Sequence, residues 1–409
     1  MHRVVITGYG IFSCLGNGVA EVEKSLREGR SGVGIDPRRI SLGYRSPLTG
    51  ILPEINTKEI LDRKSRLRFS EHGVYAYIAV KEALAMASMN DAFVKSNEIG
   101  LIFGNDSSAH AVIEGVDTIR AKNQTILVGS GNVFQSMNST ITMNLGVSLG
   151  ISGINFTISA ACASSSHALG IAAMLIRTGA QERIICGGAQ EVNEYSVGSF
   201  DGISAFSIRV GDPTRASRPF DRDRDGLVPS GGGAALILES YESAISRGAT
   251  ILAELCGYGF SSGGDHLTVP SIDAPCRAMQ RALADAETDI SEIGYINAHA
   301  TSTKVGDANE ARALVQLLGN QANQIPVTST KSMTGHELWM AGASEVIYSL
   351  LMMYGGFVAP NINLENCDEA AQSLYIPSQT IETQFDAFLS NSFGFGGTNS
   401  ALVIKKFKS

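Results

Sequence analysis

The sequence lacks the features of secreted and membrane proteins. Its six cysteines are scattered, with no pair separated by only two residues, and no apolar run approaches the roughly 18 residues that a membrane-spanning helix needs. The opening residues MHRVVITGYG match a first core strand better than a targeting segment. We therefore expect a cytoplasmic protein without disulfides and without a membrane span.

Positive charge is also scarce. Lysine and arginine number 32 against 40 aspartate and glutamate residues, which gives a net charge of -8. Because a surface that follows phosphates needs an excess of cations, general nucleic-acid binding is not expected. A local basic patch is compatible with this balance, and the run LDRKSRLRF supplies the cationic side chains of Arg63, Lys64, Arg66 and Arg68.

The chain does contain an alternation of short Val- and Ile-rich runs with amphipathic stretches, which is typical of an α/β layered fold. Strands are predicted in the first half at Val4–Thr7, Gly100–Phe103, Asn155–Ser159, Arg183–Cys186 and Ala234–Glu239. Strands are predicted in the second half at Ile251–Cys256, Gly294–Ala298, Ile325–Thr328, Asp386–Asn391 and Ser400–Ile404.

The two halves resemble each other. Gly8-Tyr9-Gly10 recurs as Gly257-Tyr258-Gly259, TISAACASSSHALGIAAML is matched by VTSTKSMTGHELWMAGASEVIYSLLM, and GGGAALILES is matched by GGTNSALVIKK. The three pairings occur in the same order, so we predict an internal duplication. The halves would be residues 1–245, with the nucleophile described below, and residues 246–409. No long linker or low-complexity tract separates them, so they are expected to pack intimately.

Cys162 is the candidate nucleophile. It follows an apolar strand and precedes a run of small, helix-compatible residues, so its thiol is expected at a sharp turn and a helix N-terminus. The helix dipole favours the reactive thiolate there by about 1 kcal/mol, which is less than one pKa unit, so geometry and an oxyanion hole must supply the remaining activation. The other cysteines lack such a turn and are interpreted as structural: Cys14, Cys186, Cys256, Cys276 and Cys367.

Two further strand-end motifs carry ionisable side chains. His299 lies in NAHATSTKVGD, and Lys331 and His336 lie five residues apart in STKSMTGH, with Glu345 on the helix that follows. A single histidine is more often structural, but three strand-end motifs that suit one reaction indicate a catalytic constellation. The remaining histidines are interpreted as structural, with His167 as a packing residue: His2, His72, His110, His167 and His266.

A glycine-rich turn, NSFGFGGTNS, occupies residues 391–400. Gly394, Gly396 and Gly397 free its backbone to expose N–H groups, so the turn can hold an oxyanion, although composition alone leaves a plain hairpin turn open. The turn is too short for a dinucleotide loop, and Gly231–Gly233 lacks the Lys-Ser/Thr pair of a nucleotide-binding loop.

These motifs resemble those of one family. The family is that of the beta-ketoacyl-[acyl-carrier-protein] synthases. Its nucleophile motif resembles ACASSSH, its first histidine motif HATST, its lysine and second histidine motif KSMTGH, and its terminal loop FGFGGTN. The likeness extends along nearly the whole chain through VVITGYGI, RASRPFDRDRDGLVPSGGGAALILE and GGFVAPNINLEN. The chain looks most like the elongating synthases of dissociated bacterial fatty-acid synthesis. The resemblance implies the thiolase fold, a five-layered αβαβα arrangement of two duplicated halves, each with a mixed five-stranded sheet, and a homodimer.

The resemblance also implies the chemistry. Cys162 would accept an acyl chain from acyl carrier protein, malonyl carrier protein would lose carbon dioxide to give an enolate, and the enolate would attack the acyl-enzyme. The products would be a 3-oxoacyl carrier protein two carbons longer, carbon dioxide and free carrier. Neutral His299 and His336 would stabilise the enolate, and the backbone N–H groups of Cys162 and Phe395 would hold the tetrahedral intermediates, each donor typically contributing about 3 kcal/mol.

Supporting roles follow from the same resemblance. Lys331 would support the histidines electrostatically with Glu345 as its partner, and no cofactor is implied because the carrier protein brings its own phosphopantetheine. The substrate-binding residues would be Thr301 and Thr303, which match positions that bind the pantetheine arm, together with Gly394 and Gly396. A structural monovalent cation would lie near Asn297, Glu345 and Asn391. The carrier, which is strongly acidic, would dock on Arg63, Lys64, Arg66 and Arg68, although these residues also suit a plain solvated helix face.

The sequence departs from the family pattern beside the active histidines. Ala300 replaces the usual glycine, Lys304 replaces a common proline, and Leu338-Trp339-Met340 replaces a small-residue stretch. Acyl-chain preferences therefore cannot be copied from better-known members.

Several alternatives use related chemistry. A thiolase would need a second catalytic cysteine near the C-terminus, but Cys367 lies in NLENCDEA without such a motif. A non-enzymatic chain-length partner would lack the nucleophile, and a Cys-His hydrolase would leave Lys331 and the second histidine unexplained. The main alternative is the same condensation in a polyketide or aryl-polyene pathway.

Overall fold

The computed structural model describes residues 1–263 and 271–408, and within them the chain forms two mixed five-stranded sheets. The first has the order β6-β5-β7-β8-β1 and the second the order β11-β10-β14-β15-β9. In both, the first three strands are parallel, the fourth is antiparallel to them, and the fifth is antiparallel to the fourth. The strands of the first sheet are β1 (Val4–Ser13), β5 (Gly100–Gly104), β6 (Asn155–Ile158), β7 (Arg183–Gln190) and β8 (Gly232–Ser240). Those of the second are β9 (Ala253–Ser262), β10 (Tyr295–Asn297), β11 (Val327–Thr328), β14 (Ala387–Phe393) and β15 (Thr398–Lys406).

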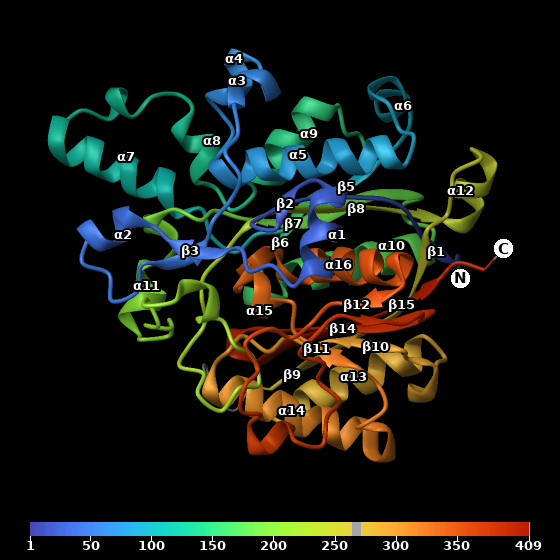
Figure 1. Cartoon of the computed structure of the whole chain (residues 1–409). Helices are drawn as coiled ribbons and strands as arrows, with labels where there is room; N and C mark the ends of the chain where they lie inside the picture. Colours follow the sequence, from blue (N-terminus) through green and yellow to red (C-terminus); the bar gives the residue numbers. More distant parts are fainter. Residues whose placement is uncertain (264–270, 409) are drawn as a thin grey trace.

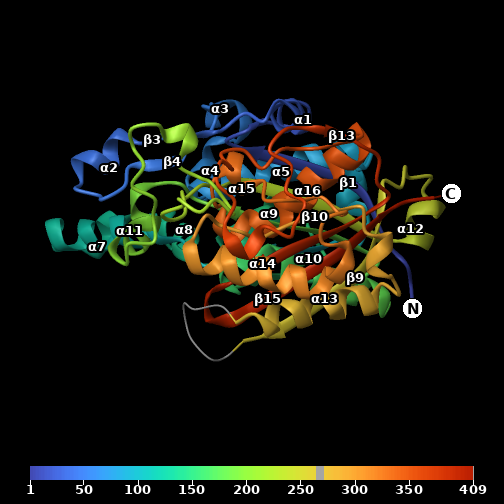
Figure 2. The same cartoon turned by 60° about the horizontal axis from the view of Figure 1, so that its bottom comes forward.

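The two sheets stack with helices in five layers (Figure 1). One pair of helices covers the outer face of the first sheet, a second pair lies between the sheets, and a third pair covers the outer face of the second sheet (Figures 1 and 2). In that order they are α5 (Glu71–Met86) and α9 (Thr140–Leu149), α10 (Ser164–Arg177) and α16 (Ala341–Gly355), and α13 (Asp273–Asp285) and α14 (Lys304–Leu318). The first 13 residues of α16 are all buried, as a helix of the middle layer requires. The predicted fold is confirmed.

The Gly-Tyr-Gly repeat has a packing cause. A β-carbon on Gly8 of β1 would lie 2.3 Å from the carbonyl oxygen of Ala83 in α5, and one on Gly257 of β9 would lie 2.1 Å from that of Ala282 in α13. The second glycine of each motif meets the same helix one turn earlier. Each half therefore seats its first outer helix directly on its first strand, which only glycine allows.

All ten predicted strands are present, but their ends differ. β1 continues to Ser13, β7 to Gln190 and β9 to Ser262, because pairing with neighbouring strands extends them through glycine-rich and polar residues that carry no apolar pattern. The sheets join where Val5 and Ile6 pair with Glu254 and Ala253. The domain division at residue 245 stays a prediction.

The remaining helices and strands connect the layers. The strands are β2 (Gly16–Asn17), β3 (Val33–Ile35), β4 (Leu48–Gly50), β12 (Phe357–Val358) and β13 (Ile381–Glu382). The helices are α1 (Val19–Glu28), α2 (Pro37–Ser41), α3 (Thr57–Ile60), α4 (Arg63–Arg66), α6 (Asp91–Ser96), α7 (Ala109–Lys122), α8 (Asn132–Ser136), α11 (Glu194–Gly202), α12 (Tyr241–Ser246) and α15 (Lys331–Thr334). None of the helices in the described ranges combines the length and hydropathy needed to cross a membrane.

Candidate active site

Cys162 lies on the expected sharp turn. β6 ends at Ile158, Ala161 adopts a left-handed backbone with φ of 47°, and a 3-10 turn over Ala161–Ala163 leads directly into α10. The turn brings α10 against the end of β5, where a β-carbon on Gly104 would lie 2.4 Å from the backbone nitrogen of Ser165. The strained residue before the nucleophile and the close helix leave the Cys162 side chain 5% exposed.

The three strand-end motifs meet at this cysteine. His336 places Nε2 3.0 Å from Sγ of Cys162, and the His299 ring stands edge-on to the His336 ring at a centroid distance of 5.3 Å. Nδ1 of both histidines is buried without a hydrogen-bond partner in the described structure. If Nδ1 carried the proton, a buried N–H group would have no acceptor, which is unfavourable. The proton of each neutral ring therefore lies on Nε2, and each ring donates from that nitrogen.

Burial sets the protonation of these groups. It raises the pKa of the Cys162 thiol to about 12, while the Lys331 charge lowers it and the carboxylate of Asp106 raises it. Burial, followed by the charge of Lys331, holds the pKa of His299 and of His336 well below the usual range, so both rings are neutral at pH 7. Desolvation of the charged sulfur therefore outweighs the small contribution of the helix dipole, and Cys162 rests as a thiol.

Lys331 is paired with Glu345, as expected. Its Nζ donates to Glu345 Oε1 from the next helix, and both side chains are almost completely buried. Burial raises the pKa of Glu345 to about 8, and the adjacent lysine opposes that shift. The Lys331–Glu345 pair lies next to the two histidines, and the charge of Lys331 acts on both rings.

Glu310 is a site residue that the sequence reasoning missed. Its carboxylate accepts the backbone N–H groups of His299 and Ala300 at 2.9 and 2.6 Å and the amide of Asn391 at 3.1 Å. Burial raises the pKa of Glu310 to about 7. Glu310 therefore fixes the strand end that carries His299. Asp307, three residues earlier on α14, is buried as well, but burial is a property of the fold, so the sequence carried no signal for either residue.

The glycine-rich turn lies across from Cys162. It follows β14, and Gly396 adopts a left-handed conformation with φ of 77° that favours glycine. The Phe395 side chain is 42% exposed and stacks over Phe200 of α11 at 6.1 Å. Within the described part of the chain neither the Cys162 nor the Phe395 backbone N–H bonds to a backbone acceptor, and the Cys162 N–H faces its own sulfur, so both can turn to an oxyanion.

One pocket of about 590 Å³ connects these groups to the surface. Its inner end contains Cys162, His299 and His336, and the helix start at Lys304 and Val305 lines it nearer the exposed surface. Thr301 and Thr303 line the pocket, with their hydroxyls 3.2 Å apart. Gly394 also lines it, whereas Gly396 lies in the adjoining turn.

The chain matches two sequence models of known domains. Residues 1–244 match the beta-ketoacyl synthase N-terminal domain, and residues 252–365 match the beta-ketoacyl synthase C-terminal domain. The chain belongs to the beta-ketoacyl synthase family. It is 40% identical to the 3-oxoacyl-[acyl-carrier-protein] synthase 1 of Haemophilus influenzae over the full length of both proteins.

Solved beta-ketoacyl synthases share the whole fold. A beta-ketoacyl synthase from Burkholderia phymatum superposes with a TM-score of 0.93 at 36% identity and full coverage of both chains. A type II polyketide ketosynthase determined in complex with its acyl carrier protein superposes with a TM-score of 0.87 at 31% identity, covering 99% of this chain and 100% of its own.

The residues expected near a cation have unpaired oxygens. Oδ1 of Asn297, Oδ1 of Asn391 and Oε2 of Glu345 are buried without hydrogen-bond partners in the described structure. Their donors are engaged: the Asn297 amide donates to Glu345 O and Ser349 Oγ. Oxygen atoms of this kind fit a hard cation. No cluster of three or more His, Cys, Asp or Glu side chains within residues 1–263 and 271–408 could hold a metal ion.

The remaining predicted residues lie outside the catalytic centre. His167 bonds Tyr258 and Thr398 at 2.6 and 3.0 Å, as expected of a packing residue. His266 lies outside the described residues. In the basic run, Arg63 and Lys64 are exposed, whereas Arg66 and Arg68 are half-buried and Arg66 donates to the backbone oxygen of Leu61.

Proposed function

We propose that this chain is a 3-oxoacyl-[acyl-carrier-protein] synthase of fatty-acid elongation. The observation that carries the proposal is the convergence of Cys162, His299 and His336 in one pocket, with Nε2 of His336 3.0 Å from the sulfur. Full-length relatives at about 40% identity carry this name. The six unpaired cysteines support a cytoplasmic location. The reaction needs no dissociable cofactor, because the acyl groups arrive as thioesters.

In the first step, the acyl group moves from the carrier thiol to Cys162. The sulfur of Cys162 bonds to the acyl carbon, the carrier carbon–sulfur bond breaks, and the proton of the Cys162 thiol ends on the departing carrier thiol. Because burial raises the thiol pKa, this proton must leave as the new bond forms. The N–H groups of Cys162 and Phe395 hold the oxyanion of the tetrahedral intermediate.

In the second step, malonyl carrier protein enters the emptied pocket. The bond between the malonyl carboxyl carbon and the neighbouring carbon breaks, which releases carbon dioxide and places negative charge on the thioester oxygen. The Nε2–H groups of His299 and His336 stabilise this charge. The enolate carbon attacks the acyl carbon on Cys162, and the carbon–sulfur bond breaks. The departing Cys162 thiolate takes a proton from solvent, which restores the thiol, and the product on the carrier protein is two carbons longer. Thr301 and Thr303 hold the pantetheine arm, and Lys331 with Glu345 supports the histidines.

The test is intact-mass and product analysis with a panel of acyl carrier proteins, with and without malonyl carrier protein. An acyl adduct on Cys162 followed by an elongated 3-oxoacyl carrier protein is the expected result. Acyl transfer without condensation, or an unmodified Cys162, would contradict the proposal. The series of products also separates fatty-acid elongation from a polyketide or aryl-polyene pathway.

The exposed cations of α4 are proposed to dock the acidic carrier protein. A related ketosynthase has been solved in complex with its acyl carrier protein, which supports a carrier interface in this family. Charge reversal at Arg63 and Lys64 should raise KM for carrier-bound substrates about tenfold or more and leave kcat nearly unchanged, because long-range attraction mainly affects encounter. Activity with acyl-pantetheine thioesters should not change. Lys24→Glu, at another exposed site, is the matched control, and equal KM values in all variants would exclude this patch.

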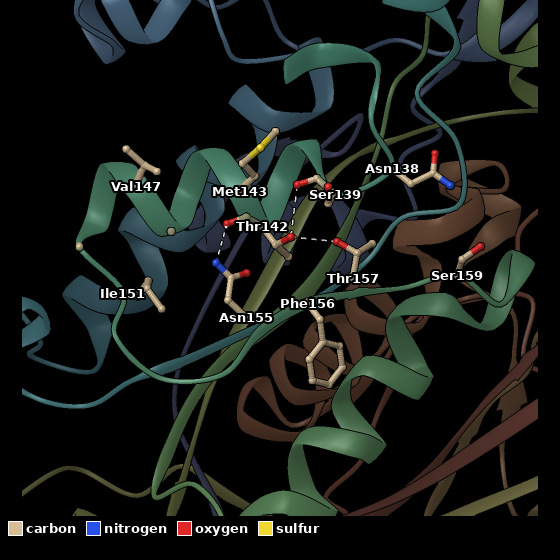
Figure 3. A pocket seen from close by; sticks show the side chains of 12 residues that line it. Asn138, Ser139, Thr142, Met143, Val147, Ile151, Asn155, Phe156, Thr157 and Ser159 are labelled. Carbon is tan, nitrogen blue, oxygen red and sulfur yellow. Dashed lines mark hydrogen bonds between the residues drawn. The ribbon is translucent and has the colours of Figure 1, made fainter. Parts of the chain in front are cut away.

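A homodimer is proposed through the free edge of the first sheet. β6 ends the strand order and is partly exposed along its length, whereas its neighbour β5 is fully buried. Beside it lies a cavity of about 910 Å³ whose lining includes Met143, Val147, Ile151 and Phe156 (Figure 3). An edge strand has unpaired backbone N–H and C=O groups that can bond to a strand of another chain. A twofold axis would place β6 against β6 of a second copy.

Val147→Glu should therefore convert the dimer to a monomer. The Val147 side chain is 65% exposed in the single chain, so the substitution leaves the fold unchanged but places a charge in the proposed interface. Sedimentation equilibrium at micromolar concentration measures the change. Ile245→Glu, at an exposed position of α12, is the control and should stay dimeric. A monomeric parent protein would refute this interface.

A monovalent cation is proposed to be held by Asn297, Asn391 and Glu345. When bound, it would balance charge and complete the contacts of their unpaired oxygens. Sodium or potassium should raise the thermal midpoint of the protein relative to a tetramethylammonium salt at equal ionic strength, since binding to the folded state alone stabilises it. The Asn391→Ala variant should lose that difference; equal midpoints of the parent protein in all salts would refute the site.

A further inference from the structure

Trp339 lies behind the nucleophile. It follows His336 in the 3-10 turn Leu338–Met340, and its side chain is 6% exposed. It belongs to the small buried cluster that contains Cys162, together with Val197, Phe206, Leu227 and Leu338. Its ring centroid is 6.4 Å from that of Phe200, which lines the pocket. The indole therefore does not line the pocket itself but packs directly behind its inner end, against residues such as Cys162 and Leu227 that do line it.

The indole carries a donor that the protein does not use. Nε1 of Trp339 is buried and has no hydrogen-bond partner in the described structure. An indole nitrogen only donates, and a buried donor without an acceptor is costly. The nearby Phe200 ring is tilted by 49°, and an aromatic face is at best a weak acceptor. An acceptor from outside the chain would relieve this cost.

The acyl chain is the group that can bring such an acceptor. In the proposed mechanism the pantetheine arm lies on the side of the pocket lined by Thr301 and Thr303, so a chain transferred to Cys162 would extend away from that side, toward Phe200 and the cluster behind it. The carbonyl oxygen of the new thioester faces the backbone N–H groups proposed as the oxyanion hole. The acceptor for Trp339 must therefore come from farther along the chain.

We propose that Trp339 determines acyl specificity and that its N–H group selects chains carrying a keto or hydroxyl oxygen over unsubstituted chains. The inference rests on the proposed condensation but not on its assignment to fatty-acid elongation, because oxygenated acyl chains are substrates of the alternative polyketide pathway. An unsubstituted chain leaves the buried donor unsatisfied, whereas an oxygenated chain satisfies it. Sites that hydrogen-bond a substrate oxygen discriminate strongly against analogues that lack it.

The experiment measures the second-order rate of Cys162 acylation by intact mass. Octanoyl carrier protein is compared with carrier proteins bearing eight-carbon chains that have a keto group at carbon 3, 5 or 7. At least one keto chain should react about tenfold faster than octanoyl in the parent protein. Trp339→Phe keeps an aromatic ring but removes the donor, so the preference should disappear. Phe206→Leu changes packing in the same cluster without removing a donor and should keep the preference.

The outcomes separate this inference from the proposed function. If no chain acylates Cys162 in the parent protein, the condensing function itself fails. If chains acylate Cys162 but octanoyl reacts as fast as every keto chain, or if Trp339→Phe keeps the keto preference, the role of Trp339 is refuted. Equal loss of preference in Trp339→Phe and Phe206→Leu would also refute it, because packing and not the donor would then be responsible.

Discussion

Cys162→Ala should abolish acyl transfer while the protein stays folded. No other thiol lies beside the histidine pair in the described structure, and Sγ forms the bond to the acyl carbon, so the rate of acylation should fall by at least about 10⁴-fold. The deletion removes a single buried sulfur atom, which costs about 1 kcal/mol of folding free energy. Intact mass after incubation with acyl carrier protein and thermal unfolding measure the two quantities.

The same variant separates the nucleophile from the histidines. Cys162→Ala leaves Nε2–H of His299 and His336 in place, so it should still release carbon dioxide from malonyl carrier protein. Cys186→Ala is the matched control, because Cys186 is a fully buried thiol on β7 outside the pocket. Acylation of the Cys162→Ala protein, or its loss in Cys186→Ala, would assign the nucleophile elsewhere.

Lys331→Met should remove most decarboxylation and destabilise the protein. The substitution leaves the Glu345 carboxyl buried without its cationic partner, which costs about 3–5 kcal/mol where that carboxyl is ionised and about 1–3 kcal/mol where it is protonated. It also removes the positive charge nearest the developing enolate, and the loss of one such contribution typically lowers the rate by about 10²-fold or more. Urea unfolding and carbon dioxide release are the measurements.

The stability of Lys331→Met should depend on pH. Burial already raises the pKa of Glu345 to about 8, and the loss of Lys331, which opposes that shift, raises it further. The unfolded carboxyl releases its proton near pH 4.3, whereas the folded one keeps it, so the variant should lose stability as the pH rises above about 5. A Lys331→Met/Glu345→Gln double variant should regain much of the stability at pH 8 but not the activity. Equal stability of the single and double variants at that pH would show that the pair is not coupled.

Much of the fold could be predicted because its signals are local. The ten strands are short Val- and Ile-rich runs, and Gly8 and Gly257 each mark the place where a helix presses on a first strand. The strand-turn-helix around Cys162 could be predicted for the same reason, because small residues directly follow an apolar strand. Strand ends such as Gln190 and Ser262 could not be predicted, because neighbouring strands extend them.

The site was only partly predictable. Cys162, His299 and His336 stand at strand ends, which topology brings to one pocket, and Lys331 of the same motif as His336 is buried against Glu345. Glu310 lies within an ordinary amphipathic helix, and its role depends on the approach of the strand that carries His299. Its acidic side chain alone indicates a solvated position.

The sequence by itself determined the order of strands and helices, the duplication and the residue types at the strand ends, because these depend on neighbours along the chain. Only the tertiary structure decided which of these groups carry charge. Burial makes Cys162 a thiol, against the small contribution of the helix dipole, and it makes His336 the neutral ring that the proposed chemistry needs. Likewise, only packing left the N–H of Trp339 without an acceptor. Desolvation is set by residues distant in sequence, so no local pattern reports it.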